Sequence, residues 1–170
     1  MGSFFGKHRA IVANNIDPEK RGRLMINIPD VLSEGPLWAE ACVPLAGPTG
    51  QRMGVYMVPP IGAEVWVEFE GGDPDYPIWV GCRWGSPSNI PTSALEGLPM
   101  SPNIVIQSLK QHKIVISDLP GPTGGIILKS DGGATIKIND LGITIDNGKG
   151  ATIELIGQSV DINKGEMRIT

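Results

Sequence analysis

The sequence has no aromatic residue after Trp84, although the chain continues to Thr170. All three Phe, both Tyr and all four Trp lie in the first half, and the apolar residues that follow are almost all Ile, Val and Leu. Globular cores ordinarily use large rings to fill volume. We therefore expect the second half to have a core too narrow for a ring, and we expect two architectures in one chain.

Long apolar runs and a strong charge imbalance are also missing. No run approaches the ~18 apolar residues of a membrane-spanning helix, and the N-terminal residues lack the basic and then apolar pattern of a signal peptide. The net charge of −4 and a pI near 5.1 argue against a general nucleic-acid binder. A hydrophobic content of 41% and a charged content of 19% argue against a disordered chain.

Cysteine and histidine are scarce. Cys42 and Cys82 each lie in an apolar, strand-like run. They could form a disulfide, but nothing else indicates a disulfide-stapled secreted fold, so we expect two buried, reduced thiols. His8 and His112 are isolated from each other, and we expect surface or hydrogen-bonded histidines instead of metal ligands.

The first half reads as short strands joined by turns, as the 23 Gly and 15 Pro of the chain favour. Alternation and turn residues predict strands at residues 8–14, 23–28, 38–43, 55–58, 64–70 and 78–83. Five or six short strands in this length predict a Greek-key barrel of the OB type over residues 1–85. Residues 86–102 are rich in Pro and Ser and are predicted to be a linker, too short to hold an enzymatic domain.

The second half repeats a pattern of short Ile-rich strands and turn residues. The strands are predicted at residues 104–106, 114–116, 126–128, 136–138, 143–145, 153–155, 160–162 and 167–169. Such a period is typical of a β-solenoid. One copy would bury too little to offset its ordering entropy, so we expect three intertwined chains to form a triangular β-helical prism over residues 103–170. The alternative is a flat meander packed on the barrel, which would leave its edges open.

A motif in the first half resembles a known family. Residues 59–81 contain P-x-x-G-x-E-V-x-V-x-F followed by G-D-P-D-x-P-x-x-x-G. Together with residues 22–29 and 38–44, this segment resembles the OB domain of contractile-tail central spikes. That group includes phage baseplate assembly protein V, the tail-lysozyme spikes and the VgrG proteins of type VI secretion. The resemblance covers residues 7–85 by motif and the rest by architecture, because these spikes continue into a trimeric β-helix.

The resemblance implies a structural role. It implies a homotrimeric, non-enzymatic needle that connects a separate hub protein at the barrel end to a PAAR-like tip protein at the C-terminal end. The needle would pierce the target envelope when the sheath contracts, and it would contact the target membrane only then. It would assemble in the cytoplasm, without a signal peptide, into a phage tail or a tail-like particle.

The resemblance also bears on individual residues. Some spikes of this group end in a His-x-His motif that binds iron; this sequence has none, so no cofactor or metal is expected. The residues expected to contact the tip protein are Met167, Arg168, Ile169 and Thr170. The family-signature turn consists of Gly72, Asp73, Pro74, Asp75 and Pro77. Its two carboxylates could bind a hard cation, but Asp-Pro-Asp after Gly-Gly is more typical of a hairpin turn.

Two other functions deserve comparison with the spike. An OB barrel can bind single-stranded nucleic acid through aromatic residues beside a basic groove, and basic residues cluster at Lys7, His8, Arg9, Lys20, Arg21 and Arg23. A glycoside hydrolase needs two carboxylates held across a cleft. The acidic residues fall instead on predicted strand exteriors and turns, so no enzymatic activity is expected. They include Glu64, Glu68, Asp131, Asp140 and Asp146.

Overall fold

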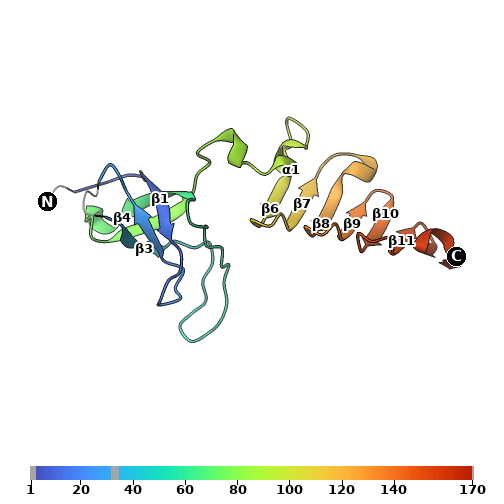
Figure 1. Cartoon of the computed structure of the whole chain (residues 1–170), viewed down its shortest axis with the longest axis horizontal. Coiled ribbons are helices and arrows are strands. Elements are labelled where there is room, and N and C mark those ends of the chain that lie inside the picture. Colours follow the sequence, from blue (N-terminus) through green and yellow to red (C-terminus); the bar gives the residue numbers. More distant parts are fainter. Residues whose placement is uncertain (1–2, 32–34, 170) are drawn as a thin grey trace. The chain divides into compact units, whose positions relative to one another are not determined.

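The computed structural model describes residues 3–31 and 35–169. The chain divides into two compact units, Met1–Pro87 and Ser88–Thr170. Each unit is described by itself. Figure 1 shows the strands of both units, coloured along the sequence.

The first unit is a closed five-stranded barrel with strand order β1-β2-β3-β5-β4. Its strands are β1 (His8–Asn14), β2 (Leu24–Asn27), β3 (Leu37–Ala41), β4 (Glu64–Phe69) and β5 (Pro77–Cys82). β1 pairs with both β2 and β4, which closes the barrel, and β3 pairs with β5 in parallel. The predicted OB-type barrel is confirmed.

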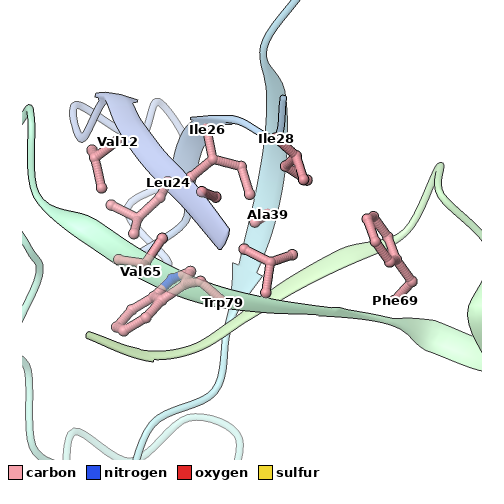
Figure 2. Packing of buried hydrophobic residues seen from close by; sticks show 10 residues of the cluster. Val12, Leu24, Ile26, Ile28, Ala39, Val65, Phe69 and Trp79 are labelled. Atoms are coloured by element: carbon pink, nitrogen blue, oxygen red, sulfur yellow. The ribbon is translucent and has the colours of Figure 1, made fainter. Parts of the chain in front are cut away.

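Alternating residues of the strands fill the barrel. Figure 2 shows the side chains of this cluster, in which Trp79 and Phe69 are the two aromatic members. The Nε1 of Trp79 donates a hydrogen bond of 3.1 Å to the carbonyl oxygen of Gly22, so the one polar atom of this buried ring has a partner. The core members are Ala10, Val12, Leu24, Ile26, Ile28, Ala39, Val65, Val67, Phe69 and Trp79.

One predicted strand is wrong. Residues 55–58 lie in the long connection between β3 and β4 and do not form a strand. The connection is held instead by an isolated bridge between Ala46 and Gly54 and by a hydrogen bond from the Val55 N–H to the Leu45 carbonyl. The apolar residues there suggested a strand, but no partner strand lies beside them in the closed barrel.

The segment predicted as a linker contains short helical turns. η2 (Pro87–Asn89) is followed by α1 (Thr92–Leu95). The Lys113 ammonium donates a hydrogen bond of 2.6 Å to the Ser93 hydroxyl, and the Asn103 amide donates one of 2.8 Å to the Ser93 carbonyl. Residues 88–102 therefore belong to the second unit and are fastened to its sheet.

The second unit is an eight-stranded antiparallel meander in which every strand pairs with the next along the chain. β6 to β11 follow one another side by side in Figure 1. All eight predicted strands are confirmed. They are β6 (Ile104–Gln107), β7 (Lys113–Ser117), β8 (Gly125–Lys129), β9 (Thr135–Asn139), β10 (Gly142–Asp146), β11 (Thr152–Ile156), β12 (Ser159–Ile162) and β13 (Met167–Ile169).

Short helical turns complete the order of elements. η1 (Glu70–Gly72) follows β4, η3 (Gly121–Thr123) precedes β8, and η4 (Asn163–Gly165) precedes β13. A single chain thus forms an open sheet. The intertwined triangular prism would need further copies, and it stays a prediction.

Candidate assembly interface

The register of the sheet aligns the Ile-rich strands into two continuous apolar rows. Row one is Ile104, Ile116, Ile126, Ile138, Ile143, Leu155, Val160 and Ile169. Row two is Ile106, Ile114, Leu128, Ile136, Ile145, Ile153, Ile162 and Met167. Since members of both rows lie two residues apart in each strand, both rows share one face of the sheet.

This apolar face is uncovered within one chain. Most members of the two rows are between 38% and 64% exposed. Of the buried hydrophobic residues among those described, Val115 alone belongs to the sheet; the others form the barrel core. A continuous apolar face of this size marks an interaction surface.

The opposite face differs along its length. Its central row begins with Val105, Val115 and Ile127 and continues with Lys137, Thr144, Glu154 and Asp161. Val115 is only 5% exposed, and α1 contacts the neighbouring strand β6. From β9 onward the row is polar. Only one face of the sheet is therefore apolar along the whole meander.

The apolar face is hollowed along one side. A groove of about 950 Å³ lies over row two, with Ile136, Ile145 and Ile153 among its lining residues. The rest of its lining comes from the first and last residues of three turns, from Asn163 of η4 and from neighbouring strand ends. The three turns are Ser108–His112, Ser130–Ala134 and Asn147–Ala151. We call the side of the sheet formed by these three turns the groove edge. Within the described residues, no member of row one lines the groove.

The turns of the groove edge are stacked on one another. The Asp131 N–H donates a hydrogen bond of 3.2 Å to Nδ1 of His112, which joins the first turn to the second. Gly148 has φ +70°, and a Cβ there would lie 2.7 Å from the carbonyl carbon of Gly133. The second and third turns thus approach backbone to backbone, and this side of the groove is a fixed wall.

In the barrel, Asp17 organises the connection between β1 and β2. Its carboxylate accepts hydrogen bonds from the backbone N–H groups of Glu19, Arg21 and Arg23 and pairs with the Arg23 guanidinium at 2.8 Å. The Asp17 side chain is 4% exposed. The Arg23 side chain is the main cause that holds the pKa of Asp17 well below its usual range, and the same pair raises the pKa of Arg23.

The basic cluster of the barrel is largely paired with carboxylates. Lys7 contacts Glu68 at 2.6 Å, and Arg21 contacts Glu19 at 3.0 Å and Glu40 at 2.8 Å. Arg23 pairs with Asp17 and lies 5.3 Å from the centroid of the Trp38 ring. Because these cations already have partners, the cluster offers less charge to a phosphate backbone than the sequence suggested.

The predicted signature turn connects β4 and β5. The Asp73 N–H donates to the Glu70 carbonyl, and the Tyr76 N–H donates to the Asp73 carbonyl. The Asp75 N–H donates a hydrogen bond of 3.0 Å to the Asp73 carboxylate. The Asp73 carboxylate thus has a role inside the turn.

The residues that the structure describes contain no group of three or more His, Cys, Asp or Glu side chains placed to hold an ion. They also contain no helix long and apolar enough to cross a membrane. His8 packs its ring against Phe4 and Phe69.

The expected burial of the cysteines is wrong. Cys42 and Cys82 are both free thiols, as expected, but both are exposed. Cys82 is the last residue of β5, and Cys42 follows the end of β3. The apolar runs around them suggested burial, but both residues lie at strand ends, beyond the cluster that fills the barrel.

The residues predicted to contact a tip protein lie at the end of the sheet. Met167 and Ile169 are exposed members of β13, the last strand, and the backbone of Arg168 pairs with Asp161. Thr170 lies outside the described residues. In the meander β13 has a neighbour on one side, β12, so its other backbone edge faces away from the sheet.

The two units define a class of protein: an all-β chain with an OB-type barrel and a separate antiparallel sheet that carries an uncovered apolar face. Residues 8–84 match the family described as the type VI secretion system/phage-baseplate injector OB domain. Residues 103–168 match the phage baseplate V C-terminal trimerisation domain. These matches support placing the chain in a type VI secretion and phage-baseplate protein family. No curated protein matched the chain.

The trimerisation match supports self-association as a homotrimer, and it coincides with the sheet that carries the two apolar rows. Sequence reasoning found the Ile-rich strands that carry these rows but missed the groove over row two. The sequence signal that could have indicated the groove is the clustering of turn residues at Ser130–Ala134 and Asn147–Ala151. It also missed the Asp17–Arg23 pair, because the two residues meet only when the connection between β1 and β2 folds back.

Proposed function

We propose that this protein is the central spike of a contractile injection system or phage-tail baseplate. In this proposal, three copies place their sheets around one axis, with rows one and two inside, to form a triangular β-helical prism. The role is structural and not enzymatic. The observation that carries the proposal is the uncovered apolar face, whose extent coincides with the trimerisation match.

The burial of apolar surface favours the association of three sheets into this prism. Burying an aliphatic side chain that is about half exposed contributes on the order of 1 kcal/mol. The two rows therefore contribute on the order of 10 kcal/mol per copy. Three such faces offset two association steps, each of which costs ~4–15 kcal/mol in lost translational and rotational freedom.

The side-chain sizes fit a narrow prism. Each strand offers two inward residues, and the rows consist of Ile, Leu and Val with a single Met, Met167. Inward side chains from three sheets meet close to the axis, where a Trp or Phe ring would not fit. The absence of aromatic residues after Trp84 supports this arrangement.

The prism accounts for the mechanical role. Each sheet is hydrogen-bonded continuously from β6 to β13, so force along the axis meets no hinge within the prism. The barrel would bind a separate hub protein. The exposed end at β13 would bind a PAAR-like tip protein, and the particle, assembled in the cytoplasm, would carry the spike through the target envelope.

A cryo-EM map of contractile particles from the source cell tests this function. The proposal expects three copies of the barrel and sheet at the centre of the baseplate, on the axis of the tube. Particles from cells that lack this chain should have no complete baseplate. Complete baseplates without the chain, or density for it only at the baseplate periphery, would contradict the proposal.

A further inference from the structure

The groove over row two has a complement on the opposite side of the same sheet. We call that side the Leu141 edge; it is formed by the connections between β7 and β8, β9 and β10, and β11 and β12. Leu141 lies in the tight turn between β9 and β10 and is 55% exposed. Within the described residues, neither residue of this turn lines the groove.

The Leu141 turn is held rigidly by its neighbours. The Leu141 N–H donates a hydrogen bond of 2.9 Å to the Asn139 side chain. The Asp140 carboxylate accepts one of 2.8 Å from the Gly121 N–H. Because the backbone is already ordered, docking of the Leu141 side chain would cost little conformational entropy.

The part of the groove that lies beside β9 and β10 is also held rigidly. Its floor there is Ile136 of β9 and Ile145 of β10, and Ala134 and Ala151 line it from the adjoining turns. The Asn147 side chain accepts hydrogen bonds from the Lys149 and Ala151 N–H groups, at 2.8 and 3.0 Å, which hold the turn Asn147–Ala151 in place. The site is apolar, open and large enough for one leucine.

Three-fold symmetry brings the two features together. In a closed ring of three identical sheets, each contact is heterologous, so the groove edge of one copy meets the Leu141 edge of the next. The same symmetry keeps equivalent strands at the same level along the axis. Leu141 then lies at the level of β9 and β10 of its neighbour, where Ile136 and Ile145 form the groove floor.

We propose that Leu141 of each copy docks in the row-two groove of the next copy, against Ile136, Ile145 and Ala151. This inference rests on the trimer of the proposed function and adds the direction and residues of its contacts. The three contacts close a ring in which every copy gives one leucine and receives one.

Cysteine cross-linking tests this contact in the full chain. In a background that carries Cys42→Ser and Cys82→Ser, the variant Leu141→Cys/Ala151→Cys is oxidised and separated on a denaturing gel. Leu141 directly precedes β10, and Ala151 lies in the turn beyond the far end of this five-residue strand, which spans ~17 Å. A disulfide within one chain is therefore excluded. We expect covalent dimers and trimers.

Two control variants show whether a cross-link is specific for the proposed contact. Leu141→Cys alone should stay monomeric on the gel. So should Leu109→Cys/Ala151→Cys, because both positions lie on the groove edge. A trimer in solution that cross-links only through the Leu109 pair, or through neither pair, would overturn the Leu141 contact and leave the proposed function intact. A monomer in solution would overturn the proposed function itself.

A second variant tests the contact by affinity. Leu141→Ala should weaken trimer association by roughly tenfold or more per contact, because it empties an apolar site. Leu95→Ala is the matched control. Leu95 lies in α1, is 68% exposed and lies on neither the groove edge nor the Leu141 edge, so its truncation should leave association unchanged. Equal effects of the two variants would contradict the proposed docking.

Discussion

At the scale of single residues, the chain places its most specific polar interaction in the barrel. Asp17 is nearly buried and accepts hydrogen bonds from several donors of the β1–β2 connection. A carboxylate with these partners stabilises the fold only while it is ionised. The contribution of the β1–β2 connection to the stability of the barrel therefore depends on pH.

We predict that acid destabilises the barrel through Asp17. The folded-state pKa lies below the unfolded value of ~3.9, so the contribution is complete above that value and is lost as the pH falls toward the folded pKa. Urea unfolding at pH 7 and at pH 3, followed by tryptophan fluorescence, measures this, because all four Trp lie at or before Trp84 in the barrel unit. Asp17→Asn should be less stable than wild type at pH 7 and should change less with pH.

Asp30→Asn is the matched control for this prediction. Asp30 is an exposed carboxylate shortly after β2, and its replacement should leave both the stability at pH 7 and its pH dependence close to wild type. A pH dependence of Asp17→Asn equal to that of wild type would show that Asp17 does not carry the effect.

The second prediction at the residue scale concerns Gly142, a glycine of the sheet. Gly142 has φ +148°, and a Cβ at this position would collide with the Leu155 carbonyl oxygen. Gly142→Ala should therefore lower the free energy of unfolding of the sheet by ~1–3 kcal/mol. Gly132→Ala, where the Cβ would meet open space, should have little effect. Thermal unfolding followed by circular dichroism compares the two; equal melting temperatures would contradict the prediction.

At the scale of elements, adjacent residues of β9 separate the two faces of the sheet. Ile136 belongs to row two, and Lys137 lies on the opposite face. Ile136→Glu would place three carboxylates inside the proposed prism, which is unfavourable without partners. We expect it to prevent trimer formation, whereas Lys137→Glu should leave the trimer intact. Light scattering after size exclusion gives the masses, and a trimeric Ile136→Glu would exclude the apolar face as the interface.

The segment before the sheet also acts as an element. Ser93 is buried and joins α1 to Asn103 and Lys113 through two hydrogen bonds. Ser93→Ala removes the hydroxyl that accepts from Lys113 and leaves the carbonyl that accepts from Asn103. We therefore expect the free energy of unfolding of the second unit to fall by ~1 kcal/mol. Amide hydrogen exchange of residues 92–95 should become faster, and exchange in β4 should not change. Unchanged exchange in α1 would show that the Lys113 contact does not hold the segment.

Much of the element order was predictable from the sequence because turn residues separate strands with strict alternation. The strand at residues 104–106 and the last at 167–169 were found from the Ile pattern alone, since period-two alternation with a polar face is specific for a strand. The failed strand at residues 55–58 has apolar residues but no partner, and pairing is not visible in a local pattern. The groove likewise depends on how Gly133 and Gly148 approach each other across two turns.

At the scale of the whole molecule, the two units use different sources of stability. The barrel has its own core, whereas the sheet exposes the apolar rows that other sheets would bury. The family matches assign the sheet to self-association and the barrel to an injector OB domain. Oligomer formation and stability of the second unit should therefore be coupled and depend on protein concentration.

The molar mass of the full chain in solution, measured by sedimentation equilibrium over a wide range of concentrations, tests the central claim most directly. We predict three times 18.1 kDa, or about 54 kDa, with dissociation accompanied by loss of the β-sheet signal. A species of 18.1 kDa that keeps its full sheet signal at high dilution would contradict the account, because the apolar face would then be stable without a partner.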